Sequence, residues 1–314
     1  MKTGRRKYSS LGILIAGLIL LVGLPRYATS YNVIFITNIL MYVILTLSWA
    51  IFSGPTGYIS LATAAFFGVG VYASALFSSG FPFFAVLLIG GAASFCLAFL
   101  VGALTLRLRG MYFSMFTFGL VELVRHFVHW WEINVMGTVG RLVMSLDPTT
   151  IYYILLMIFF AALLTSYLIK HSKYGLALES IGESEEAAAH IGVNVNRVKA
   201  VTFAVSAFFI AITGSVMAMR WTYIDPTVAF DIGRSFMPVL MAIFGGMGGH
   251  LYGPVTGAAI FSVLEEMLTT RFPYYYMLLF GLTMLLVILF MPFGVEGAIE
   301  KWRKSGNAGP GEKA

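Results

Sequence analysis

The sequence predicts an all-α, polytopic integral membrane protein with about ten transmembrane helices. Apolar residues make up 59% of the 314 residues and charged residues only 11%, whereas a soluble domain usually carries about 25% charged residues. Most of the chain falls into apolar runs of about 17–25 residues, the length needed to cross ~30 Å of hydrocarbon. We therefore expect a single transmembrane domain over residues 1–314 and no separate soluble domain.

Polar, glycine-containing or proline-containing breaks separate the apolar runs. The expected spans cover about 10–28, 32–52, 57–79, 83–106, 111–131, 150–169, 200–221, 235–246, 251–270 and 273–292. A short basic tail, 293–314, follows the last span. The first span has basic residues before it and Ala28-Thr29-Ser30 after it, which is also typical of a cleaved signal peptide. The count of ten spans favours an uncleaved first helix.

The basic residues indicate how the chain is oriented. Ten spans put both ends of the chain on one side of the membrane. If that side is the cytoplasm, the inner segments hold fourteen of the 20 Lys and Arg residues and the outer segments hold six, which follows the positive-inside rule. We therefore expect both termini and the polar segment 174–199 in the cytoplasm. The basic residues lie at the ends of apolar runs, so the net charge of +6 indicates topology and no nucleic-acid partner.

Nothing in the sequence indicates catalysis. Cys96 is the only cysteine, and no cysteine or second histidine pair accompanies His126 and His129, so no metal site and no other cofactor is expected. The phosphate-binding pattern G-x-x-x-x-G-K-[ST] does not occur in the chain. We expect that the chain is not an enzyme, has no catalytic residues and does not hydrolyse ATP itself.

The expected helix 57–79 is rich in small and hydroxyl-bearing residues. Small residues spaced by three and four let membrane helices approach closely. Two interpretations remain open: these residues pack helices together, or they line a path suited to a small zwitterion with an apolar side chain. The candidate path residues in this helix are Gly57, Ser60, Thr63, Phe66 and Phe67.

Glu122 is the sixth candidate residue for a translocation path. It lies roughly 16 Å from the expected cytoplasmic end of its helix, near the membrane midplane, where an ionisable side chain is costly and functional. The alternative is a structural ion pair with Arg125, joined by Glu265 or Glu266 of a later helix.

The polar segment 174–199 separates two expected spans and contains four of the fourteen carboxylates. Residues Ser180 to Ile191 have the pattern of a short amphipathic helix, which Gly192 would end. Asn196 would then cap the next membrane helix. The length and position of this segment favour a docking surface over an ordinary solvated loop.

A family pattern occurs within this segment. Glu186-Ala187-Ala188 and, after three further residues, Gly192 have the form E-A-A-x-x-x-G of the membrane subunits of bacterial ABC importers. Together with GYISLATAAFFGVGVYASA and MAIFGGMGGHLYGPVTGAA, the sequence resembles the branched-chain amino acid ABC transporter permease family, LivM type. The resemblance extends in order over about residues 35–292.

The resemblance implies a permease subunit of the bacterial inner membrane that imports branched-chain or related amino acids. It also implies a second permease subunit of the LivH type, two ATP-binding subunits and a periplasmic substrate-binding protein. The polar segment would hold the coupling helix that docks on an ATP-binding subunit. The implied coupling residues are Gly182, Glu183, Glu186, Ala187, Ala188 and Gly192.

Two departures from the family pattern leave the substrate open. Ala62 and Thr63 stand where the family often has Gly and His, and the run 137–140 differs from the T-G-G that the family often has after this helix. A permease for urea, short amides or sugars is therefore one alternative. A proton-driven secondary transporter that uses Glu122 and the nearby histidines is an alternative of another class. The sequence does not decide whether the permease pairs with a copy of itself or with a different subunit.

Overall fold

The computed structural model describes residues 21–106, 108, 110–143, 145–246, 252–275, 278–279, 281–282 and 285. The start of the expected first span, most of the expected span 273–292, the tail 293–314 and the segment 247–251, with Gly248 and Gly249, lie outside these residues. Residues 21–27 are helical. The count of ten spans is therefore not tested by the described residues.

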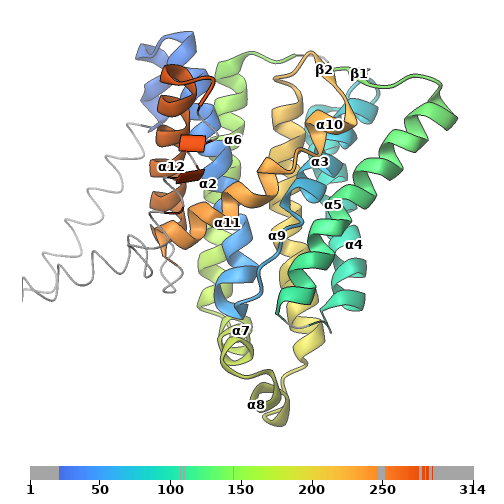
Figure 1. Ribbon diagram of the computed structural model, residues 1–314, viewed down its shortest axis with the longest axis vertical. Coiled ribbons are helices and arrows are strands. Elements are labelled where there is room, and N and C mark those ends of the chain that lie inside the picture. Colours follow the sequence, from blue (N-terminus) through green and yellow to red (C-terminus); the bar gives the residue numbers. More distant parts are fainter. Residues whose placement is uncertain are drawn as a thin grey trace, which may run out of the picture.

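Long helices make up most of the described chain, and most of them run roughly parallel or antiparallel, whereas α11 lies obliquely across its neighbours (Figure 1). They are α2 (Ser30–Thr56), α3 (Thr63–Phe77), α4 (Phe83–Thr105), α5 (Met111–Trp131), α6 (Pro148–Lys170), α9 (Val195–Ala218), α11 (Gly233–Gly245) and α12 (Tyr252–Arg271). Shorter elements are a π-helix η1 (Glu132–Met136) and the helices α7 (Lys173–Glu183), α8 (Glu185–His190) and α10 (Pro226–Ala229). The two-residue strands β1 (Arg141–Leu142) and β2 (Tyr223–Ile224) pair in antiparallel orientation.

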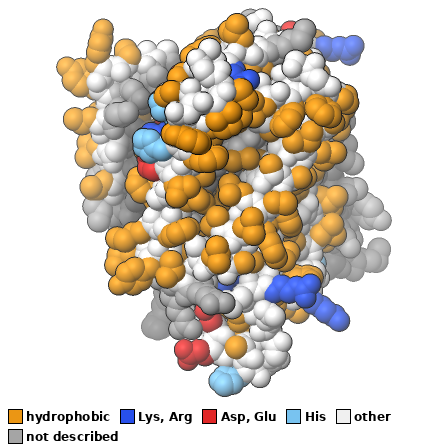
Figure 2. Space-filling view, turned by 90° about the vertical axis from the view of Figure 1, so that its right-hand side faces the viewer, with side chains coloured by type: hydrophobic (Ala, Val, Ile, Leu, Met, Phe, Trp, Pro, Cys, Tyr) orange, Lys and Arg blue, Asp and Glu red, His pale blue; other side chains and the backbone are white. Residues whose placement is uncertain are grey.

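The all-α, polytopic membrane fold predicted from the sequence is confirmed. Within the described residues, α2, α4, α6, α9 and the segment Pro226–Gly245 are long and apolar enough to cross a bilayer. Figure 2 shows a broad hydrophobic surface on one side of the molecule, with most of the visible charged side chains near its two ends. This distribution suits a protein whose middle faces hydrocarbon.

Helix α9 forms the centre of the bundle and packs against α2, α3 and α4. Glycines bring α9 and α3 into backbone contact: a Cβ atom added to Gly70 would lie 1.9 Å from the carbonyl oxygen of Ala211, and one added to Gly214 would lie 2.2 Å from that of Phe67. Ser215 donates a hydrogen bond of 2.8 Å to the carbonyl oxygen of Gly70. Small residues and interhelical hydrogen bonds are what hold membrane helices together, because lipid provides no hydrophobic drive between them.

The expected helix 57–79 is corrected by the structure, because it begins only at Thr63 and residues 57–62 are irregular. Gly57 ends α2 with a φ of +70°, a left-handed conformation that favours glycine. Side chains of α2 and α5 then form hydrogen bonds with the backbone of the irregular residues. Backbone polar groups at membrane depth need such partners inside the protein. Trp49 donates to the carbonyl of Ser60 at 2.8 Å, Ser114 donates to that of Ile59 at 2.7 Å, and Thr117 Oγ1 accepts from the amide of Leu61 at 3.0 Å.

Two further expectations near α9 are wrong. The helix begins at Val195, earlier than the expected 200, and its N-cap is Asn194 and not Asn196. The Asn194 side chain accepts from the amide of Arg197 at 3.2 Å, which satisfies one of the unpaired amides of the first turn. The residue preceding the cap, Val193, belongs to the small core beneath α7 and α8.

We predict that the α3–α9 contact tolerates no added methyl group. Gly70→Ala should lower the free energy of unfolding by about 1–3 kcal/mol, because the new Cβ meets a backbone oxygen that cannot move aside. Gly119→Ala is the matched control, since Gly119 is also helical but a methyl group added there would have no neighbouring atom within 4 Å. Denaturant unfolding of the purified chain in detergent measures both, and equal stability of the two variants would contradict the prediction.

Candidate functional site

The short helices α7 and α8 extend from one end of the bundle, between α6 and α9 (Figure 1). The expected single helix from Ser180 to Ile191 is corrected: the backbone is extended at Ser184, which divides it in two. The Ser184 hydroxyl accepts from the amide of Ala187 at 3.3 Å and so caps α8. Gly192 follows α8 with a φ of +90°, in the position of a helix stop that the sequence predicted.

Part of the expected coupling surface is turned toward the chain itself. Ala188 is fully buried in a small core with Leu178, Ile181 and Val198. Gly182 is exposed on one side, but its other side packs against the end of α2, where an added Cβ would lie 2.1 Å from the carbonyl oxygen of Pro55. Ala188 and Gly182 therefore fix α7 and α8 on the bundle, and the structure does not place the Ala188 side chain on a docking surface.

The remaining expected coupling residues lie on the outside of the segment. Glu183, Glu186, Ala187 and Gly192 are all exposed. Ile191 is also exposed over 74% of its surface. The structure thus leaves two carboxylates, a small alanine and an apolar side chain exposed on one protruding segment, and we call these exposed residues the coupling surface.

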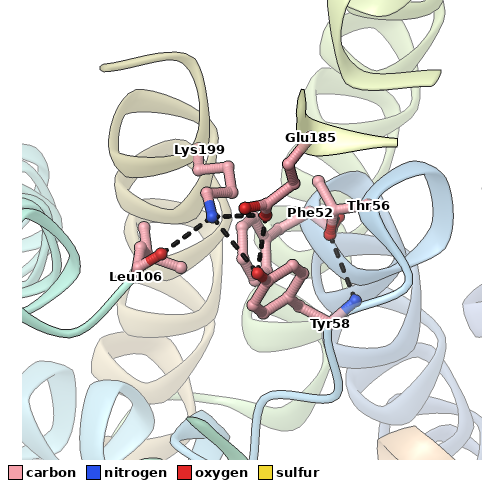
Figure 3. A network of polar contacts seen from close by, with 6 residues as sticks. All are labelled: Phe52, Thr56, Tyr58, Leu106, Glu185 and Lys199. Carbon is pink, nitrogen blue, oxygen red and sulfur yellow. Dashed lines mark hydrogen bonds and ion pairs between the residues drawn. The ribbon is translucent and has the colours of Figure 1, made fainter. Parts of the chain in front are cut away.

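A buried ion pair joins α8 to the bundle (Figure 3). Lys199, in the second turn of α9, is completely buried. Its ammonium group lies 2.6 Å from Glu185 Oε1, 2.8 Å from the carbonyl oxygen of Leu106 and 3.3 Å from the hydroxyl of Tyr58. These contacts use all three donors of a lysine. Tyr58 in turn donates to Glu185 at 2.6 Å.

This cluster, which we call the lysine cluster, joins four separate parts of the fold. Lys199 belongs to α9, Glu185 to α8, Leu106 to the end of α4, and Tyr58 to the irregular segment after α2 (Figure 3). Sequence reasoning missed it, because Lys199 was interpreted as a charge of the cytoplasmic loop and Glu185 as one solvated carboxylate among four. A signal was present only in the periodicity of α9, where Lys199 lies next to the buried Val198 and Ala200.

Most of the candidate path residues are buried within the described structure. Ser60, Thr63, Phe66 and Phe67 are buried at 4% exposure or less. The rings of Phe66 and Phe203 pack edge to face, with centroids 5.3 Å apart. These contacts suit the helix-packing interpretation, and a role of the four residues in a translocation path stays a prediction.

Gly57 differs from the other candidates, because it lines a mostly apolar hollow of about 470 Å³. The hollow also involves Ser114 of α5 and Phe236 of α11. The hydroxyl of Ser114 is engaged by the carbonyl oxygen of Ile59, which leaves mainly apolar side chains to contact any molecule in the hollow.

Glu122 forms the local ion pair that the sequence offered as one interpretation. Its carboxylate lies 2.5 Å from the guanidinium of Arg125 and 3.5 Å from Nε2 of His126. Among the described residues, neither Glu265 nor Glu266 joins this pair; Glu266 instead accepts from the hydroxyl of Tyr31 at 3.0 Å. The Glu122 and Arg125 side chains remain 28% and 27% exposed on the outside of α5.

Known proteins match most of the chain. A family model described as branched-chain amino acid transport system / permease component matches residues 31–288. The high-affinity branched-chain amino acid transport system permease protein LivM of Escherichia coli (strain K12) is 27% identical, over 90% of this chain and 74% of its own length. The corresponding LivH protein of the same strain is 28% identical over 50% of each chain. The ribose import permease protein RbsC of Haemophilus influenzae is 30% identical over 39% of this chain and 40% of its own.

We predict that the lysine cluster contributes strongly to stability. Lys199→Met should lower the free energy of unfolding by about 1–3 kcal/mol, because the partly buried Glu185 carboxylate loses its counter-charge. The double variant Lys199→Met/Glu185→Gln should be less destabilised than the sum of the two single variants. Denaturant unfolding in detergent measures the free energy of unfolding of the unchanged chain, the two single variants and the double variant, which together form a double-mutant cycle.

Lys173→Met is the control for the cycle, since Lys173 is exposed at the start of α7 and its loss should leave the free energy of unfolding unchanged. Strict additivity of the Lys199 and Glu185 substitutions would show that the two charges do not interact.

Proposed function

Because the chain belongs to the family of permease components of branched-chain amino acid transport systems, we propose that it is a permease subunit of an ABC importer that moves branched-chain or related amino acids into the cytoplasm. The family match over residues 31–288 carries this proposal. The similarity to LivM, which extends over 90% of the chain, supports the substrate class. The ribose permease matches over a much smaller share of the chain, which favours amino acids over sugars.

The proposed importer contains several other subunits. A second permease of the LivH type pairs with this chain, two ATP-binding subunits supply the energy, and a periplasmic binding protein delivers the substrate. The ion pair on the outside of α5 supports a permease partner: Glu122 and Arg125 are partly exposed there, and ionisable side chains in a membrane face protein or water and not lipid. The complex lies in the bacterial inner membrane with both termini of this chain in the cytoplasm.

The coupling surface is the proposed contact with an ATP-binding subunit. It protrudes beyond the bundle (Figure 1), and its exposed residues include Glu183, Glu186, Ala187 and Gly192. Glu186 would pair with a basic residue of the partner, and Ala187 would allow close approach. The lysine cluster would pass a movement of α8 to α9 and to the segment after α2, because Glu185 of α8 contacts both through Lys199 and Tyr58.

The proposed energy source separates this function from proton-driven transport. The complex, purified through a tag on this chain and reconstituted in liposomes, should take up leucine only with ATP and binding protein present. Imposing a pH gradient without ATP should drive no uptake. Urea and ribose serve as control solutes that the complex should not accumulate. Uptake by this chain alone, driven by a pH gradient, would refute the proposal.

We predict that changes on the coupling surface separate ATP hydrolysis from transport. Glu186→Lys reverses an exposed charge, and Gly192→Val places a β-branched residue at a φ of +90°. Both variants should still insert and assemble, but leucine uptake per ATP hydrolysed should fall at least tenfold. Glu179→Lys makes the same charge change at an exposed position of α7 and is the control. Unchanged coupling in both variants would rule out the docking role.

A further inference from the structure

A charged hollow of about 280 Å³ lies near the end of the bundle opposite α8. Its walls come from α2, the end of α9, the start of α11, and α12. The volume is close to the lower limit of about 300 Å³ for small-molecule sites. Helix α9 begins beside α8 and is 24 residues long, so its far end lies about 36 Å from the coupling surface. If the coupling surface faces the cytoplasm, the hollow belongs to the outer half of the protein.

The hollow gathers charges of both signs, although its helices are otherwise apolar. Two guanidinium groups, of Arg220 and Arg234, and three carboxylates, of Asp231, Glu265 and Glu266, contribute to its lining. These five side chains carry a formal charge of +2 and −3, hence −1 in total. Ionisable groups within a membrane protein mark ligand or ion sites by default, and this balance disfavours an anion.

The two arginines are held in place by different contacts. Arg220 donates a hydrogen bond to Oδ1 of Asn38. The guanidinium of Arg234 lies 4.9 Å from the ring centre of Phe67 and 5.0 Å from that of Trp221, and it donates to a backbone carbonyl. Arg234 is therefore fixed between two rings as part of the wall, while a planar guanidinium such as that of Arg220 has further donors for a ligand carboxylate.

Two polar groups of α12 supply acceptors and donors that the described chain does not use. Ser262 is 5% exposed, lines the hollow, and its hydroxyl has no hydrogen-bond partner among the described residues. Glu265 lies almost one turn further along α12. Within the described part of the chain, its carboxylate forms no ion pair. A buried hydroxyl without a partner costs free energy, and a bound polar molecule would satisfy it.

The rest of the lining is mixed, with polar groups on Asn38, Tyr42 and Thr269 and apolar side chains on one part of the wall. Phe35, Met41 and Met217 contribute to the walls, and Met41 and Met217 are almost fully buried. The hollow therefore combines a cation, an anion and an apolar wall within a volume suited to a small molecule. An aliphatic amino acid has all three complementary parts: a carboxylate, an ammonium group and an apolar side chain.

We propose that this hollow is a binding site for a zwitterionic aliphatic amino acid within the membrane domain. Arg220 binds the α-carboxylate, Glu265 binds the α-ammonium group, and Ser262 donates or accepts one further hydrogen bond. Charge-assisted hydrogen bonds of this kind are about twice as strong as neutral ones. The proposal rests on the proposed function for the class of ligand and for the outward orientation of the site.

Cysteine protection tests the site in the intact complex. Thr269 lines the hollow and is exposed, and Cys96 is the only native cysteine of the chain. Thr269→Cys is introduced together with Cys96→Ala, and labelling of this chain by a maleimide is timed in nanodiscs without binding protein. Leucine should slow labelling. Leucinamide, which lacks the carboxylate, and 4-methyl-2-oxopentanoate, which lacks the ammonium group, should each need at least tenfold higher concentration.

Added substitutions identify the residues that bind the ligand. Arg220→Gln and Glu265→Gln should each raise the half-protecting leucine concentration at least tenfold, and Ser262→Ala should raise it less. Arg271→Gln, at the exposed end of α12 and outside the hollow, should leave it unchanged. The labelling rate without leucine should be the same in every variant, which shows that the hollow is still formed. The proposal would be overturned if leucine, leucinamide and 4-methyl-2-oxopentanoate protected equally well. It would also be overturned if leucine protected every variant at the same concentration.

The same preparations separate this site from the proposed function. ATP-driven leucine uptake without any protection by leucine would refute the site and retain the importer. Protection by leucine without uptake would retain the site and refute the importer. Loss of both would refute both.

Discussion

The backbone contact between α9 and α3 is the constraint on which the rest of the structure depends. Gly70 and Gly214 let the two helices approach until a single added Cβ would overlap a carbonyl oxygen. Helices packed this closely cannot slide past each other, so α9 has one position relative to α3. That position sets Lys199 at one end of the helix and Arg220 just beyond the other. The coupling surface and the charged hollow are therefore placed by the same contact.

Burial of Lys199 explains why α8 is more than a surface loop. An ammonium group without solvent is costly unless it is paired and its hydrogen bonds are satisfied, and Glu185, Leu106 and Tyr58 do both. Because Glu185 is part of α8, that helix cannot move away alone without leaving Lys199 buried and unpaired. In the proposed coupling role, a force applied to the coupling surface would therefore act on α9 and the segment after α2 as well.

Features that depend on local sequence could be predicted, and features that depend on distant residues could not. The length of the apolar runs predicted the membrane helices. The concentration of carboxylates predicted the position of the polar segment that forms α7 and α8. Residues 57–62 are as apolar as the helix that follows, and only side chains from α2 and α5 show why they are irregular. The lysine cluster joins Tyr58 and Lys199, 141 positions apart, so no periodicity within one helix reveals it.

The two polar sites are connected by a helix that is well suited to move as one body. Helix α9 contains no proline and is buried along most of its length, so bending it would break its close contact with α3. The walls of the charged hollow come from α2, α11 and α12 as well as from the end of α9. Arg220 directly follows α9 and Glu265 belongs to α12, so a displacement of α9 relative to α12 changes the distance between them. Because a zwitterion must contact both groups at once, movement at the coupling surface would alter how tightly the hollow holds its ligand.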